Sequence, residues 1–144
     1  MLVTPAVRVW AAAEVPAEAW SWALPRRNQV TLWELLAALC GVQWFLQQAL
    51  EYPELVVFID NTAALHTLLR GSSRQADFNS VLGSVWFDLA RANVLMHAHY
   101  VPSALNLADG PTRASKADKS RATLESLRFK EVAWQWPVGV PWRQ

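Results

Sequence analysis

The chain has 144 residues, of which 53% are apolar and 17% are charged, so it can form one domain with a hydrophobic core and is not a disordered chain. Its net charge of +1 identifies no class of partner. The single cysteine, Cys40, excludes a disulfide within the chain, and we interpret it as a buried thiol of an intracellular protein, cytoplasmic or nuclear.

The first half of the chain predicts two short strands followed by a long helix. Residues 2–4 and 7–12 are typical of a β-hairpin, and residues 13–27 indicate irregular structure. From residue 31 to residue 50, leucines recur at the three-to-four spacing of a helix, which Pro53 closes. Because polar residues interrupt this apolar helix, we expect no membrane span, and we also expect no signal peptide.

The second half predicts strands that alternate with helices. Residues 55–59 form an apolar run that predicts a buried strand, and a helix is expected at residues 62–69. A further helix is expected at residues 75–92 and a strand at residues 94–101, after which a short helix carries Asp109. These elements predict an α/β fold, with a mixed β-sheet flanked by helices.

The chain from Arg113 onward differs in composition from the rest. The chain is polar and predicts a helix up to residue 130, after which it is rich in tryptophan and proline. We expect some tryptophans near the two ends to face a neighbouring domain or a partner. The polar stretch can hold a phosphate backbone, or else form a solvated helix face or a flexible tail. Its basic residues are Arg113, Lys116, Lys119, Arg121, Arg128 and Lys130.

Three carboxylates lie at the ends of predicted elements. Glu34 is near the start of the long helix, Asp60 ends the predicted buried strand, and Asp109 follows the last strand. Ligands of α/β sheets bind beyond the carboxyl ends of the strands, so these side chains can converge on one edge of the sheet. Carboxylates that lie together repel one another unless cations lie between them, and acids without Cys or His ligands suit Mg²⁺ or Mn²⁺.

Each acid also has a purely structural interpretation. Thr31 and Glu34 fit a capping box, in which each side chain satisfies a backbone donor at the start of a helix. Asp60 fits the N-cap of the helix that follows it. Asp109 precedes Gly110 and fits a turn. The sequence leaves both interpretations open for every one of the three.

The segments around these acids form three motifs. They are residues 31–38, 57–65 and 100–113. With them the chain resembles the ribonuclease H domain of reverse transcriptases, particularly those of retroelements. The third motif is the most specific, because Asn106, Ala108 and Asp109 precede a small residue and an arginine. The resemblance covers residues 1–115 and leaves residues 116–144 as a basic, then Trp- and Pro-rich extension.

The resemblance implies a ribonuclease H-like fold and endonucleolytic cleavage of the RNA strand in an RNA–DNA hybrid. Glu34, Asp60 and Asp109 would hold two Mg²⁺ or Mn²⁺ ions, with water as the nucleophile. It also implies nucleic-acid contacts and, as partners, other domains of a larger polyprotein. The expected nucleic-acid contacts are Asn61, Thr62, Arg70, Arg74 and Arg113.

The chain departs from this family in two places. The family carries its first catalytic aspartate on a strand that precedes the hairpin, whereas no aspartate occurs here before Asp60. We therefore interpret the N-terminal strand as missing and expect the isolated chain to be inactive or nearly so. Where many relatives have a histidine, the chain has Tyr100, and we interpret His97 and His99 as polar positions on one face of a strand.

Two other functions stay open. One is a catalytically inactive ribonuclease H-like module that binds nucleic acid or protein, which the missing aspartate favours. The other is a recombinase or exonuclease of the same superfamily, which the order Glu34, Asp60, Asp109 disfavours.

Overall fold

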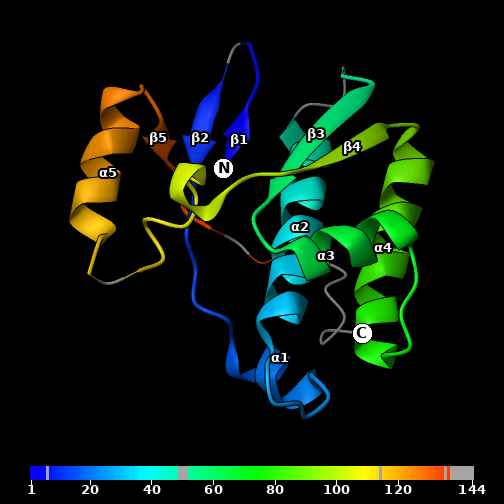
Figure 1. Ribbon diagram of the computed structural model, residues 1–144. Coiled ribbons are helices and arrows are strands. Elements are labelled where there is room, and N and C mark those ends of the chain that lie inside the picture. The colour runs from blue at the N-terminus through cyan, green and yellow to red at the C-terminus, as the bar shows by residue number, and fades with distance from the viewer. Residues whose placement is uncertain (6, 49–51, 114, 135, 137–144) are drawn as a thin grey trace. The chain divides into compact units, whose positions relative to one another are not determined.

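A computed structural model describes residues 1–5, 7–48, 52–113, 115–134 and 136. The chain divides into two compact units (Figure 1). Unit 1 combines Met1–Glu14 with Val101–Gln135, and unit 2 combines Val15–Tyr100 with Trp136–Gln144. Both units combine helices with small β-sheets, so the α/β class is as predicted. The described strands form two separate sheets rather than the one mixed sheet that was expected. The sequence-based division into residues 1–115 and 116–144 stays a prediction.

Unit 1 is built on a three-stranded mixed sheet. Strand β1 (Leu2–Val3) pairs antiparallel with β2 (Arg8–Trp10), which confirms the predicted hairpin. Strand β5 (Lys130–Glu131) pairs parallel with β2, in the register Val9 to Lys130. The sequence did not predict β5, because its two residues are charged and gain their hydrogen bonds from a strand about 120 residues away.

Helix α5 (Ala117–Ser126) ends four residues before β5 and delivers the chain to it. The amide of Arg128 donates to the carbonyl of Glu125 at 2.9 Å, and that of Phe129 donates to Leu124 at 2.9 Å. Arg128 has a φ of 63°, in the left-handed region that glycine usually occupies after a helix. This ending explains why the helix stops short of the predicted residue 130.

Unit 2 packs four helices against a two-stranded parallel sheet. Its helices are α1 (Ala17–Trp22), α2 (Val30–Gln48), α3 (Thr62–Arg70) and α4 (Ala76–Ala92). Strands β3 (Glu54–Ile59) and β4 (Leu95–Tyr100) pair in register along their whole length. Helix α2 contacts α3, α4 and β3, as Figure 1 shows. All these elements except α1 were predicted; two prolines had indicated irregular structure for residues 13–27.

Helix α2 is the core of unit 2. Leu32, Leu35, Leu39 and Val42 are fully buried along one side of it. By length and composition alone, α2 is the one helix of the described residues that could cross a membrane, over Val30–Gln47, and 44% of this stretch is buried inside the structure. The same features are typical of a core helix in a folded domain, which is how unit 2 uses α2.

The exposure of β3 contradicts the expectation of a buried strand. Of its apolar residues only Ile59 is buried, whereas Val56 is 50% and Phe58 is 63% exposed. On the paired strand, Leu95 is 65% exposed on the same face. Parallel sheets are normally covered on both faces, and within the described residues only the α2 and α3 side of this sheet is covered. Strand β3 therefore has apolar side chains on a face that no described residues cover.

Candidate functional site

Asp60 lies where β3 ends and α3 begins. The strand stops at Ile59, and α3 starts at Thr62, so Asp60 occupies the carboxyl end of a parallel strand. Its side chain is half-buried. This is the position in an α/β sheet at which ligands bind.

The structural interpretation of Asp60 as a helix cap is wrong. The N-cap of α3 is Asn61, whose Oδ1 accepts a hydrogen bond from the amide of Ala64 at 3.0 Å. Within the described residues, the carboxylate of Asp60 makes no hydrogen bond or ion pair. The carboxylate of Asp60 therefore stabilises no described part of the fold through a hydrogen bond or an ion pair.

The capping box proposed for Glu34 is also wrong. The amide of Trp33 donates to the carbonyl of Gln29, so α2 begins at Val30 and Thr31 lies inside its first turn. The side chain that serves this end is that of Asn28, whose Oδ1 accepts from the amide of Val30 at 2.9 Å. Glu34 is half-buried on α2, the helix that contacts β3, and it has an interaction partner in the structure.

Asp109 lies in unit 1, in a turn rather than in the predicted short helix. After β4 only Ser103–Leu105 form a turn of 3₁₀ helix. Asn106 then makes a local turn, with its Oδ1 accepting from the amide of Ala108 at 3.1 Å. The hydroxyl of Thr112 donates to the carbonyl of Asp109 at 2.9 Å. Asn side chains favour such turns over a helix, which explains the difference.

Gly110 fixes the position of this turn against α5. A side chain at Gly110 would collide with Ser120, a residue of α5. The small residue of the third motif therefore has a packing reason within unit 1. It lets the backbone next to Asp109 lie directly on the helix.

The carboxylate of Asp109 is paired with Arg113. Arg113 Nε lies 2.7 Å from Asp109 Oδ2, and the two side chains are 54% and 27% exposed. Arg113, predicted to contact nucleic acid, thus serves in this structure as the counter-ion of a predicted metal ligand. A metal ion at Asp109 would have to displace this guanidinium or share the carboxylate with it.

The predicted ligands lie in two different units of the structure. Glu34 and Asp60 belong to unit 2 and Asp109 belongs to unit 1, so the convergence of all three stays a prediction. Among the described residues, no group of three or more His, Cys, Asp or Glu side chains could hold a metal ion. Carboxylate oxygens have the right chemistry for Mg²⁺ or Mn²⁺, but the described arrangement does not complete a site.

The predicted nucleic-acid contacts next to Asp60 surround α3. Asn61 is used as its N-cap, and Thr62 is exposed in its first turn. At the other end, Arg70 Nε donates to the carbonyl of Ser72 at 3.0 Å, which draws the guanidinium back onto its own loop. Arg74 is exposed. Their roles in binding stay predictions.

The two histidines of β4 are surface residues, as predicted. His97 and His99 share the exposed face of the strand. His97 Nε2 lies 3.8 Å from Glu54 Oε2, a long and exposed contact, and the His99 ring lies 6.1 Å from that of Phe58. Nothing in these surroundings indicates a metal ligand.

The sequence did not predict the most buried acid of unit 2. The carboxylate of Asp77, in the first turn of α4, accepts hydrogen bonds from Arg26 Nη2 at 2.7 and 2.5 Å and from the amide of Leu24 at 3.0 Å. The side chain of Arg26 is only 17% exposed and lies 4.7 Å from the centre of the Phe78 ring. Partners about fifty residues apart leave no local signal in a sequence.

No protein-family model, curated protein or solved structure matches the chain. The functional assignment therefore depends on the three motifs and on the surroundings of their acids.

Proposed function

We propose that the chain belongs to a ribonuclease H-type, metal-dependent endonuclease domain of a reverse transcriptase, which cleaves the RNA strand of RNA–DNA hybrids. The observation that supports this function best is the state of Asp60. It occupies the tip of a parallel strand, its neighbour Asn61 has taken over the cap, and no described residue pairs with its carboxylate. A half-buried carboxylate without donors suggests a ligand that comes from outside the described residues.

Glu34, Asp60 and Asp109 would be ligands of Mg²⁺ or Mn²⁺, the ions that activate water and stabilise the leaving oxygen in phosphodiester cleavage. These residues alone do not complete a metal pair, and the resemblance implies one more aspartate on one more strand. The pairing of β3 supports that strand, because within the described residues β3 pairs only with β4, which leaves its other edge open.

The second candidate function is a non-catalytic ribonuclease H-like module that binds nucleic acid or protein. The ion pair between Asp109 and Arg113 favours it, because a guanidinium occupies the place at which the enzyme would need a metal ion. In this case Asp109 stabilises its turn, and Asp60 has lost the ligand for which its position is suited.

Mn²⁺ titration of the chain tests the enzyme proposal against the module. For the enzyme we expect saturable but weak binding, with the strongest paramagnetic broadening of NMR signals around Asp60, and we expect Asp60→Asn to abolish it. The matched control is Glu54→Gln, which removes an acid from the opposite end of the same strand. Equal Mn²⁺ binding by the wild type and Asp60→Asn would reject Asp60 as a ligand.

A further inference from the structure

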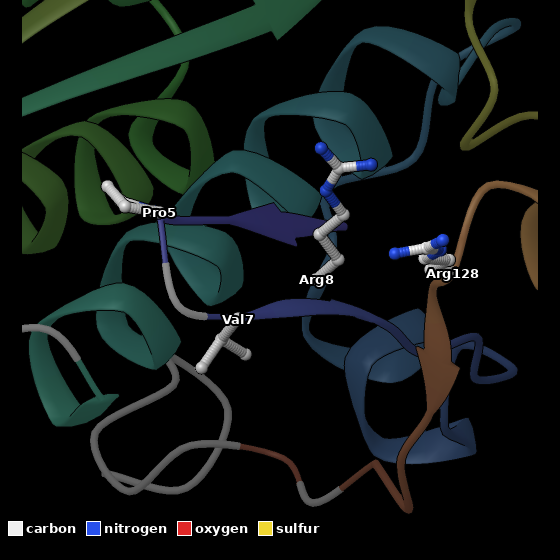
Figure 2. A pocket seen from close by; sticks show the side chains of 4 residues that line it. All are labelled: Pro5, Val7, Arg8 and Arg128. Atoms are coloured by element: carbon white, nitrogen blue, oxygen red, sulfur yellow. The ribbon is translucent and has the colours of Figure 1, made fainter.

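Unit 1 has an open pocket on its surface that contains two arginines and no acid. Its lining residues are Pro5, Val7, Arg8 and Arg128, and its volume is about 440 Å³. Arg8 is on β2, and Arg128 follows α5. Figure 2 shows the two arginine side chains on one side of the pocket and Pro5 and Val7 on the other. Residues far apart in the sequence thus bring two positive charges into one depression.

Arg8 is held in place by the loop that carries Arg128. Its Nη1 donates a hydrogen bond to the carbonyl of Leu127 at 3.2 Å. This bond uses one of the five N–H donors of the guanidinium and orients the remaining ones. The planar fork of a guanidinium matches the oxygens of a phosphate or carboxylate group.

The other two arginines of unit 1, Arg113 and Arg121, are paired with acids, whereas Arg8 and Arg128 are not. Arg121, whose guanidinium lies 5.8 Å from the centre of the Trp10 ring, pairs with Glu131 at 3.4 Å. Arg113 pairs with Asp109. Within the described part of the chain, neither Arg8 nor Arg128 contacts a carboxylate. Two like charges in one pocket repel each other, and an anion between them would remove that repulsion.

Arg128 occupies a backbone position that disfavours it. Its φ of 63° is left-handed, where a residue with a Cβ is less stable than glycine. The position follows the end of α5, and glycine would end the helix equally well. An arginine there points to a use of its side chain rather than of its backbone.

We propose that Arg8 and Arg128 form a binding site for a phosphate group. The two guanidinium groups would bind its oxygens, while Pro5 and Val7 would contact the apolar part of the molecule that carries it. The group could belong to a nucleic-acid backbone or to a free phosphate compound, and both present the same tetrahedral anion. The site does not depend on Glu34, Asp60 or Asp109.

The first experiment measures binding of a fluorescent RNA–DNA hybrid to the full chain by anisotropy. We expect Arg8→Gln and Arg128→Gly each to weaken binding by roughly tenfold. Each should also reduce the slope of log K against the logarithm of the salt concentration by about one, as expected for the loss of one phosphate contact. The matched control is Arg91→Gln, an exposed arginine in the last turn of α4 in unit 2. Its binding should stay close to that of the wild type.

Arg128→Gly also separates a binding role from a structural one. Because glycine is favoured at this φ, the urea midpoint of this variant should equal or exceed that of the wild type while its hybrid binding is weaker. A variant that loses stability and binding together would count against the site, as its effect would follow from folding. Arg8→Lys, which keeps the charge without the fork, should bind between the wild type and Arg8→Gln.

The second experiment titrates inorganic phosphate and follows the Nε–Hε NMR signals of the arginines, assigned with the same variants. Shifts of the Arg8 and Arg128 signals, together with weaker hybrid binding, support a nucleic-acid phosphate. Shifts without any effect on hybrid binding support a free phosphate compound. If phosphate shifts neither arginine signal and neither variant weakens hybrid binding, the proposal is overturned. The phosphate titration is carried out without Mn²⁺, so failure of the acid site leaves these signals unchanged and can be told apart from failure of this pocket.

Discussion

Asp60 and Asp77 lie in the same unit, each at the start of a helix, and the fold treats their carboxylates differently. Asp77 is 4% exposed and receives hydrogen bonds from Arg26 and from the amide of Leu24. Asp60 is half-buried and has no partner within the described residues. A buried charge is stable only when donors surround it. The comparison shows which acid the fold itself needs and which one is available for another task.

The largest effect that we expect is on the rate of hybrid cleavage, and it tests why Asp60 lacks a partner. If Asp60 lacks partners because a site is incomplete, a chain extended upstream by a strand that bears an aspartate should cleave an RNA–DNA hybrid in the presence of Mg²⁺. We expect the rate to exceed that of the 144-residue chain by at least about 10²-fold, since misplaced catalytic groups cost on that order. Cleavage of a labelled hybrid measures this rate.

The control for this experiment is the same added strand with asparagine in place of aspartate, which should leave the rate low. Asp60→Asn in the extended chain should also remove cleavage. An extended chain that binds the hybrid but does not cut it would instead support the non-catalytic module.

Stability measurements test the comparison directly. Asp77→Asn leaves the guanidinium of Arg26, only 17% exposed, without its charged partner, and should lower the free energy of unfolding by about 3 kcal/mol. Asp60→Asn should change it by less than about 0.5 kcal/mol, because no described contact is lost. Urea unfolding followed by tryptophan fluorescence gives both values. A large loss for Asp60→Asn would show that its carboxylate is structural after all.

Cys40 is a buried ionisable group whose charge the fold does not stabilise. Burial raises the pKa of its thiol from 9.0 to about 12. The folded state therefore keeps the proton more tightly than the unfolded state. Stability should fall as the pH rises from 9 towards 12, by up to about 1.4 kcal/mol per pH unit. Urea unfolding at a series of pH values measures this slope, and Cys40→Ala should remove it.

The elements with strong periodicity were predictable from the sequence, whereas contacts between distant residues were not. Leucine spacing predicted α2, and the apolar run of residues 55–59 predicted β3. Helix α1 was missed because its six residues follow Pro16, have no side-chain cap, and are held by packing around Ala19. The two residues of β5 become a strand only by pairing with β2.

The candidate site shows the same limit. The motif pattern selected Asp60 and Asp109, but the sequence could not decide whether they were caps, turns or ligands. That decision came from neighbouring side chains: Asn61 takes the cap of α3, and Arg113 pairs with Asp109. Hydrogen bonds of this kind depend on rotamers and local backbone geometry, which residue types alone do not specify.

The smallest expected effect concerns Asp109, whose carboxylate is neither as enclosed as that of Asp77 nor as unengaged as that of Asp60. Its pair with Arg113 is largely exposed, so Arg113→Gln should lower the free energy of unfolding by less than about 1 kcal/mol. If Asp109 is a metal ligand, removing the competing guanidinium should tighten Mn²⁺ binding by up to about fivefold. Arg121→Gln, which breaks the exposed pair with Glu131 in the same unit, is the matched control. Mn²⁺ affinity that is the same in the wild type and both variants would identify the Asp109 pair as part of the turn and would favour the non-catalytic module.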